Sequence, residues 1–441
     1  MKEEELSEIH SEAIQELNKI TSALREEREQ CLSDRRFYSI AGAQWEGDLQ
    51  KQYENRPKIE INKVHSSVIR IINEARSNRI TVDFVSKDGA KNEHLANTCD
   101  GLYRSDEQDS TADEAYDNAF EEAVGGGFGA WRLRADYEDE YDEEDERQRI
   151  KIEPIYDADS SVYFNLDAKR QDKADAKCCF VISSMTYDEF EEVYDKAPMS
   201  IPKDTSSDEF DWITPDIAFI AEYYKVEIKS YKVIVFESLE GEEVRHSEKE
   251  LIEEEGLLEK LIATGYKKSR EKKVKQKKIR KYIIDGESIL EDCGYIAGTE
   301  IPIIPIYGKR WFIDNIERCM GHVRLSRDAQ ILKNIQYSNL AEISSLFKTS
   351  KPIFAPEQIK GNELFWEKDN VENYPYMLIN PIENKNGDEV LSGALGYTQP
   401  PVVPPALAAL MQVTEQDMKE MQGQDQALEQ VNSNLSGEAI S

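Results

Sequence analysis

The sequence predicts an α+β fold, and two kinds of hydrophobic spacing carry that prediction. Apolar side chains recur every three or four positions in residues 3–33, 62–75 and 310–346, which is the spacing of amphipathic helices. Apolar and polar side chains alternate in residues 131–137, which is typical of a half-buried β-strand, and further strands are predicted at 217–228 and 231–236. With 441 residues, the chain is long enough to bury a core and to form two or three domains.

The N-terminal helix predicted at residues 3–33 is strongly charged and has a single narrow apolar stripe. The stripe consists of Leu6, Ile9, Ala13, Leu17, Ile20 and Leu24. So little apolar surface does not stabilise a free helix, so we expect this one to dock on the body of the protein or on a neighbouring molecule. A strand is predicted at Thr81–Val85, and further helices are predicted at His94–Tyr103 and Ala112–Val124.

The longest helical pattern follows Gly308. Residues 301–306 are a β-branched run interrupted by two prolines, which suits an edge strand or a chain entering a turn. Beyond Gly308 the apolar spacing becomes helical, so we predict one helix over residues 310–346, roughly 55 Å long at about 1.5 Å per residue, which Gly321 could kink or divide. The polar side chains of its other face are Arg324, Arg327, Asp328, Gln330, Lys333, Asn334 and Gln336.

Two β-hairpins are predicted between residues 217 and 290. Strands 217–228 and 231–236 are separated only by the dipeptide Lys229-Ser230, which we interpret as a turn. Residues 282–290 contain an Asp-Gly dipeptide between two apolar runs, which is a strong signal for a tight turn.

The glycine-rich stretch Gly125–Trp131 invites a nucleotide-binding interpretation. A P-loop needs Lys and Ser or Thr at its end to reach phosphate and magnesium, whereas Ala130 and Trp131 follow the last glycine here. We therefore predict that the glycines end a helix and allow close backbone packing.

The segment Glu138–Glu146 is acidic at every position except Tyr141. A solvated loop joining strand 131–137 to a strand at 150–155 is one interpretation, because like charges in series repel. Divalent-cation binding is the other, although the spacing lacks the glycine and the terminal glutamate of a calcium loop.

One basic stretch, Lys267–Lys281, interrupts an otherwise acidic chain. Its basic side chains are Lys267, Lys268, Arg270, Lys272, Lys273, Lys275, Lys277, Lys278, Arg280 and Lys281. A patch that binds nucleic acid or an acidic partner and a surface strand with a solvated charged face are both consistent with this pattern. Aromatic residues are absent from it until Tyr282, which argues against a base-stacking platform.

The overall charge excludes one class of protein. Lys and Arg total 55 against 88 Asp and Glu, a formal charge of −33, which argues against a free-standing nucleic-acid binder. It does not argue against a channel through which DNA slides without sticking. The acidic start is no signal peptide, and no window approaches about 18 uninterrupted apolar residues, so no membrane helix is predicted.

The sequence predicts no enzyme, no cofactor and no metal site. Its five histidines lie far apart and form no metalloprotease pattern, and no nucleophile elbow occurs. The six cysteines include no CxxC pair, so we expect reduced residues in a cytosolic protein rather than disulfides or a zinc site.

Several segments resemble the portal proteins of tailed bacteriophages, in particular the short-tailed, Salmonella-phage-type branch. They are IPIIPIYGK followed by VRLSRDAQILKNIQYSN, then Arg56–Arg79, Ile152–Val181 and Gln430–Ile440. The likeness covers most of residues 56–441, and its specificity depends on the shared order of the segments, since none is a catalytic signature.

This resemblance implies a division of the chain into parts of the portal subunit. Residues 1–215 would be the N-terminal helix and the α/β wing, and 216–308 the hairpin-containing clip and stem junction. Residues 309–348 would be the stem helix, whose polar face would line the channel, and 349–441 would return to the wing. Crown and barrel would be absent, which predicts a chain truncated at its C-terminus.

The resemblance also implies partners and a location. Copies of the chain would form a closed ring, a dodecamer, at the capsid vertex of the virion, assembled in the host cytoplasm. The terminase large subunit, the tail adaptor or head-completion protein, and capsid and scaffolding proteins would bind it, and double-stranded DNA would pass non-specifically. The competing interpretations are an acidic oligomeric scaffold with no DNA role and a metal-dependent hydrolase that uses the acidic segment.

Overall fold

A computed structural model of the chain combines helices and sheets, as predicted, and divides it into two compact units. Unit 1 comprises Met1–Ser39 and Val64–Arg324, and unit 2 comprises Ile40–Lys63 and Leu325–Ser441. The structure describes residues 3–86, 93–137, 147–198, 210–237, 243–247, 266–347, 352–368, 374–383, 389–390, 393–398 and 404–423. Within these residues, no helix combines the length and the apolarity needed to cross a membrane.

Helix α1 (Glu3–Ser39) packs on the body of unit 1, which confirms its prediction. Ala13, Leu17 and Ile20 are fully buried and belong to one apolar cluster with side chains of the larger sheet, including Phe180 and Tyr282. The helix is nevertheless strongly acidic, so its charged side chains remain on the solvent side while the stripe faces the core.

A group of four charged side chains also fastens α1 to unit 1. The Arg35 guanidinium donates to Asp159 and Asp157 at 2.7 Å each and to Glu122 at 3.3 Å. The Glu122 carboxylate also accepts from the backbone amides of Asp157 and Ala158 at 2.8 and 3.0 Å. Burial raises the pKa of Glu122 to about 7, against the opposing effect of Arg35. One guanidinium therefore serves three carboxylates, two of them buried.

The smaller sheet of unit 1 has the strand order β2-β1-β9. Its strands are β1 (Phe128–Tyr137), β2 (Gln148–Ile155) and β9 (Ile303–Tyr307), all antiparallel to their neighbours. This arrangement confirms the predicted pairing of the first two strands and the predicted edge strand, where Pro305 needs no amide donor.

Close backbone contact explains the glycines between helix α5 (Ala112–Gly125) and β1. A Cβ at Gly129 would lie 2.0 Å from the Ala119 carbonyl oxygen, and one at Gly127 would lie 2.6 Å from the Met320 backbone. Gly127 also has a φ of 116°, which L-residues rarely adopt. The glycines therefore permit helix-on-strand packing, as predicted.

The larger sheet of unit 1 has the strand order β3-β4-β5-β7-β8, with β6 paired to β5. Its strands are β3 (Val162–Phe164), β4 (Cys178–Thr186), β5 (Ile217–Glu237), β6 (Glu243–Ser247), β7 (Lys267–Ile284) and β8 (Ile289–Ile296). The helices beside it are α6 (Ala158–Ser161) and α7 (Tyr187–Tyr194), and Thr186 begins α7 with a capping box.

Strand β5 corrects one predicted hairpin. Residues 217–237 form a single strand, and Lys229 and Ser230 are opposite Gln276 and Lys275 of β7 rather than in a turn. The dipeptide lacks Gly, Asn or Asp, which supply the positive φ of a two-residue turn, and the long strand β7 offers a continuous partner. The predicted turn between β7 and β8 is confirmed, with Asp285 accepting from the Ser288 amide at 2.6 Å.

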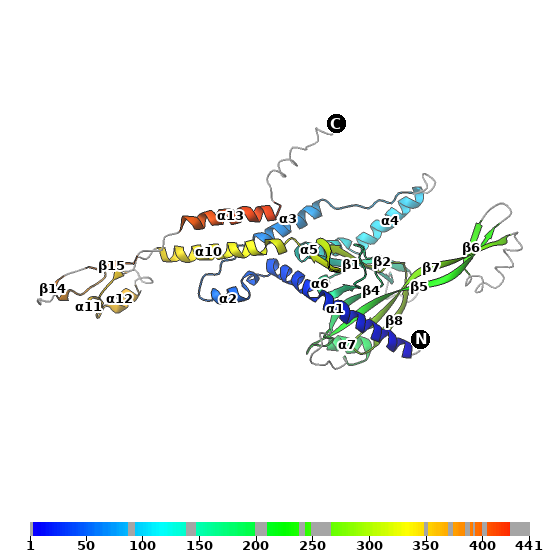
Figure 1. Cartoon of the computed structure of the whole chain (residues 1–441), viewed down its shortest axis with the longest axis horizontal. Coiled ribbons are helices and arrows are strands. Elements are labelled where there is room, and N and C mark those ends of the chain that lie inside the picture. The colour runs from blue at the N-terminus through cyan, green and yellow to red at the C-terminus, as the bar shows by residue number, and fades with distance from the viewer. Residues whose placement is uncertain are drawn as a thin grey trace, which may run out of the picture. The chain divides into compact units, whose positions relative to one another are not determined.

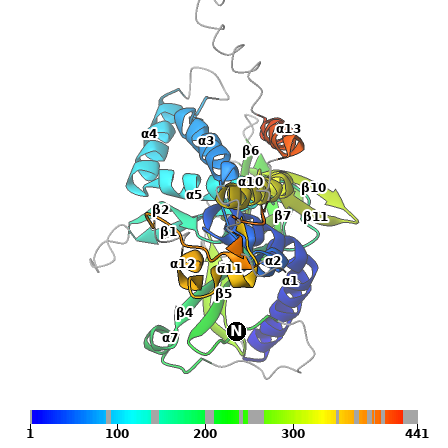
Figure 2. The same ribbon diagram turned by 90° about the vertical axis from the view of Figure 1, so that its left-hand side faces the viewer.

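The first part of the predicted long helix is also a hairpin. Strands β10 (Lys309–Ile313) and β11 (Ile316–Met320) pair only with each other among the described residues, and Figure 2 shows them side by side. Asp314 and Asn315 form the turn with φ values of 53° and 62°. Both residue types tolerate this left-handed geometry, so the dipeptide permits the two-residue turn that twisted hairpins require. Helix α10 begins only at Arg327 and extends to Phe347, after a short 3-10 turn at Arg324–Ser326.

The remaining helices of unit 1 largely follow the predictions. Helices α3 (Lys63–Ser77), α4 (Glu93–Asp109) and α5 match predicted ones. The strand predicted at Thr81–Val85 is wrong, since residues 79–86 have no regular secondary structure and Ile80 is 94% exposed. Without a neighbouring strand, alternation alone does not form a sheet.

Unit 2 is built on two helices that run side by side, α10 and α13 (Pro405–Met421), as Figure 1 shows. The segment Ile40–Lys63 contributes a 3-10 turn (Ala43–Trp45) and helix α2 (Asp48–Gln52). The smaller elements of this unit are β12 (Pro352–Ile353), α11 (Pro356–Ile359), α12 (Glu363–Lys368), β13 (Ile382–Glu383), β14 (Glu389–Val390) and β15 (Gly396–Tyr397).

Some predictions lie outside the described residues. These are the interpretations of the acidic segment Glu138–Glu146 and the resemblance carried by the closing segment Gln430–Ile440.

Candidate interaction surfaces

The basic stretch Lys267–Lys281 lies in strand β7, where it forms one side of a long two-stranded ribbon with β5 (Figure 1). Residues directly opposite each other in such a ribbon lie on the same face. On one face Lys273 is opposite Lys232, and Lys275 and Lys277 follow at two-residue steps. We call these four exposed lysines the basic ribbon face.

Like charges directly opposite each other destabilise a strand pair. Lys273 and Lys275 make no ion pair within the described part of the chain, and Lys277 donates to the Ala174 carbonyl oxygen at 3.1 Å. Lys232 and Lys273 lie directly opposite each other and both are exposed, so this face carries a high local positive charge. On the reverse face of β7, Arg270 and Lys272 are opposite Val235 and Val233.

The end of the basic stretch nearest the core has a different role. Arg280 forms an ion pair with Asp292, and Lys281 pairs with Glu222 at 3.0 Å. Burial raises the pKa of Glu222, but Lys281 and Arg132 outweigh burial and hold that pKa below its ordinary value. Arg280 and Lys281 are half-buried and neutralised within the chain, so the predicted partner-binding surface is open only toward the outer part of the ribbon.

In helix α10, polar side chains predicted to be exposed are buried, and a leucine is exposed instead. Gln330, Lys333 and Asn334 are at most 2% exposed, whereas Leu332 is 41% exposed. The prediction that this polar face is open to a channel is therefore wrong for these three residues. Lys333 forms an ion pair with Glu415 of α13, and Gln336 donates to the Thr414 hydroxyl at 2.9 Å.

An extended backbone segment explains why the polar face is buried. Residues 59–63 lie along α10, and the helix side chains bond to them as a neighbouring strand would. Gln330 accepts from the Lys63 amide at 3.1 Å and donates to the Ile61 carbonyl at 2.7 Å. Asn334 and Ser338 accept from the amides of Ile61 and Ile59 at 3.1 and 3.0 Å. Buried backbone groups must be paired, and these side chains pair them.

Of the other predicted channel residues, Arg324 lies outside α10, whereas Arg327 and Asp328 begin it. Arg324 belongs to unit 1, where it pairs with Asp34 at 2.7 Å and Glu27 at 3.1 Å. Arg327 is half-buried, and Asp328 is exposed.

The helices of unit 2 leave large apolar side chains at the surface. Leu410 and Val413 of α13 are 46% and 54% exposed, and Leu325, just before α10, is 62% exposed. We call Leu325, Leu332, Leu410 and Val413 the exposed apolar set. Single exposed apolar residues are common on protein surfaces, so this set is a candidate contact with another molecule only if its members are covered together. Sequence reasoning missed this set because the side of a helix that faces the core depends on tertiary contacts, which apolar spacing does not encode.

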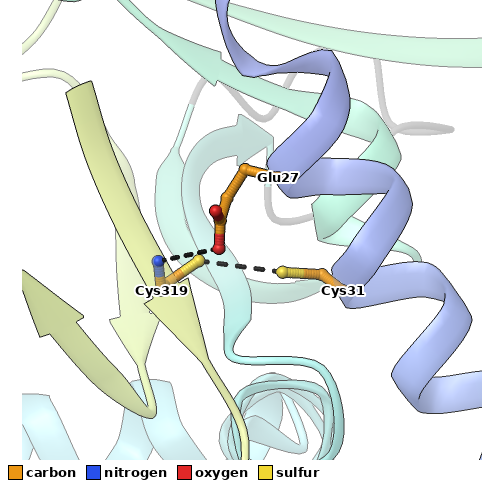
Figure 3. A group of neighbouring side chains, drawn as sticks. All are labelled: Glu27, Cys31 and Cys319. Atoms are coloured by element: carbon orange, nitrogen blue, oxygen red, sulfur yellow. Dashed lines mark hydrogen bonds between the residues drawn. The ribbon is translucent and has the colours of Figure 1, made fainter. Parts of the chain in front are cut away.

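Three buried side chains of unit 1 could be taken for a metal site. Glu27 and Cys31 on α1 and Cys319 on β11 place ligand atoms within 4.8 Å of one another (Figure 3). However, the Glu27 carboxylate already accepts from the Cys319 amide and from the Arg318 and Arg324 guanidinium groups. Two guanidinium groups in contact with the donor set repel a cation, so the arrangement does not favour a metal ion.

A family model described as "Phage P22-like portal protein" matches residues 15–441. The chain belongs to the P22-like portal protein family. A portal protein from Acyrthosiphon pisum secondary endosymbiont phage 1 is 38% identical over 448 aligned residues. The alignment covers 99% of this chain and 62% of that relative, so the chain spans about 62% of the relative's length.

Family membership confirms the resemblance seen in the sequence and the α+β architecture expected from it. Neither the family description nor the relative's name carries an enzymatic activity. The basic ribbon face and the exposed apolar set are therefore the two candidate surfaces of this portal chain. Both are candidates for contacts with other protein molecules.

Proposed function

We propose that this portal chain is the subunit of a closed ring, a dodecamer, at one vertex of a phage capsid. Double-stranded DNA would pass through the ring during packaging into the capsid and during ejection. The observation that carries the proposal is the family match over residues 15–441. Residues 1–215 would serve as N-terminal helix and wing, 216–308 as clip and stem junction, and α10 as the stem helix, followed by the return of 349–441 to the wing.

The exposed apolar set supports the ring. A closed ring requires each subunit to present one surface to the next in a heterologous contact. Helices α10 and α13 bury their polar sides against each other and against residues 59–63, so leucine and valine side chains remain available to a neighbour. A second copy of the chain would cover them.

The acidic composition supports the passage of DNA. A basic wall with many phosphate contacts would bind DNA tightly and in a salt-dependent manner, whereas an acidic or neutral wall lets it slide. With a formal charge of −33 per chain, we expect a channel face with few basic side chains. DNA contact would then be non-specific and transient.

Electron images of the purified chain, taken down the particle axis and combined with a mass measurement in solution, test the proposal. A closed ring with a central hole is expected, whereas a monomer or dimer would contradict it. If such rings form but DNA does not become nuclease-resistant when they are built into capsids, the alternative of an acidic scaffold without a DNA role is favoured.

The basic ribbon face is proposed as the docking site for the terminase large subunit or the tail adaptor. Reversing two of its charges with K273E and K275E should weaken binding of that partner by about tenfold or more at low salt, because electrostatic complementarity is replaced by repulsion. Binding is measured with purified rings and each partner over a range of salt concentrations.

The matched control is the double variant R270E and K272E. It makes the same change of charge on the same strand but on the opposite face. Binding that falls equally in both variants would indicate a general charge effect and would remove the basic ribbon face as the docking site. Loss of the ring itself in the K273E and K275E variant would contradict the placement of this strand on an outer surface.

A further inference from the structure

Unit 1 contains two buried thiols that meet across a long separation in sequence. Cys31 on α1 and Cys319 on β11 are 288 positions apart, yet their Sγ atoms are 3.8 Å from each other (Figure 3). Cys31 is fully buried and Cys319 is 4% exposed. The two sulfur atoms need to approach by less than 2 Å to reach the roughly 2.05 Å of a disulfide bond.

The surroundings of the two thiols differ. The hydrogen bond from Cys319 lowers the pKa of Cys31 more than burial raises it, and Arg28 and Arg324 lower it further. The Arg324 guanidinium lies 3.6 Å from the Cys31 sulfur. The pKa of Cys319 is raised by its hydrogen bond to Cys31 and by burial. Cys31 is thus the more acidic thiol of the pair, and Cys319 is the less acidic one.

The other buried cysteines lack this arrangement. Cys178 and Cys179 are neighbours on β4, so their side chains point to opposite faces of the sheet. Burial raises the pKa of Cys178 to about 12, and burial also raises that of Cys179. Cys178 and Cys179 are therefore as buried as Cys31 and Cys319, but their thiols do not share the hydrogen bond that joins Cys31 to Cys319.

We propose that Cys31 and Cys319 are a site of oxidative modification, at which a hydroperoxide converts the two thiols into a disulfide that fastens hairpin β10–β11 to helix α1. The Cys31 thiolate attacks one peroxide oxygen, the O–O bond breaks, and the leaving hydroxide takes up a proton to become water. The resulting sulfenic acid is attacked by the Cys319 sulfur, the S–S bond forms, and a second water leaves. The thiols lose two electrons and two protons, and hydrogen peroxide is reduced to two molecules of water.

The structure offers a route for the oxidant. Within the described residues, β10 and β11 pair with no other strand. Glu27 accepts from the Cys319 amide at 3.1 Å and from Arg318 at 3.2 Å, and two further contacts, Arg310 to the Lys169 carbonyl at 2.6 Å and Lys173 to Glu317 at 2.8 Å, also hold the hairpin to unit 1. Local opening of so small an element exposes both sulfurs at once. Once formed, the disulfide would close that opening.

The experiment treats the full chain with hydrogen peroxide under native conditions and measures its mass and its free thiols. We expect two of the six thiols to disappear with the loss of two hydrogens, and a non-reduced digest to contain one peptide pair joined through Cys31 and Cys319. The oxidised chain should unfold at a higher temperature than the reduced chain, and a reductant should reverse this shift.

Variants make the result specific to this pair. C31S and C319S should each lose both the link and the thermal shift, whereas C178S and C179S together should retain both. A native chain that keeps all six thiols, or that links another pair, would overturn the proposal. A link that forms without raising the unfolding temperature would overturn the fastening of the hairpin. None of these outcomes depends on ring formation. The experiment therefore tests this proposal independently of the proposed portal function.

Discussion

Replacing Arg35 with alanine is expected to lower the free energy of unfolding of unit 1 by about 3 kcal/mol at pH 8. The guanidinium is the shared partner of Glu122 and Asp159, which are 5% and 1% exposed. Without it, two buried carboxylates lose their counter-charge, and one Asp159 oxygen already has no hydrogen-bond partner in the described structure. Chemical denaturation, followed by tryptophan fluorescence, measures the loss.

The pH dependence gives this prediction a second measurement. Loss of Arg35 raises the folded-state pKa of Glu122, already about 7, and that of Asp159 still further above their unfolded values. A carboxyl group with a raised folded pKa stabilises the protein below its unfolded pKa and loses that contribution as the pH rises. The difference from the natural chain should therefore shrink between pH 8 and pH 5. The exposed neighbour Arg36 provides the control, and an equal loss in an Arg36→Ala variant would refute the role given to Arg35.

Introducing aspartate at Leu410 and Val413 is expected to convert the ring into monomers. Both side chains are about half exposed in the single chain, so the change costs the isolated fold little. In the proposed ring a neighbouring copy covers them, and a carboxylate buried there without a partner costs several kcal/mol per contact, repeated at every interface. Mass measurement in solution and electron images report the assembly state.

A matched control lies on the same helix. Gln412 and Gln416 of α13 are exposed and polar, and changing both to aspartate adds the same negative charge. The Q412D and Q416D variant should retain the ring. Intact rings of the L410D and V413D variant, with an unchanged unfolding temperature, would show that a second copy does not cover this part of α13.

Elements whose local pattern agrees with their tertiary contacts could be predicted from sequence. The stripe of α1 does pack on the core, and helices α3 and α5 form where the apolar spacing predicts helices. The stretch 309–320 failed because Phe312, Ile316 and Met320 fit both a helical and a strand spacing. Only the left-handed turn at Asp314 and Asn315 separates the two, and these residue types are also common in helices and caps.

The candidate surfaces were predictable to different degrees. The basic stretch could be found from composition, but the exposed face of its strand depends on the register with β5, which no local pattern encodes. The polar side of α10 predicted a solvent-facing surface because polar residues are usually exposed. Its burial depends on the distant segment 59–63, whose unpaired backbone needs amide and hydroxyl partners. The contact between Cys31 and Cys319 likewise arises only once the chain has folded.

The bonds between α10 and residues 59–63 restrict how unit 2 can move. A helix that packs through leucines can slide or turn, because one apolar contact replaces another. Hydrogen bonds from helix side chains to specific backbone amides allow no such exchange. Turning α10 by one residue, about 100°, would leave the Ile59, Ile61 and Lys63 amides without acceptors at the same moment. Any shift of α10 must therefore carry residues 59–63 with it.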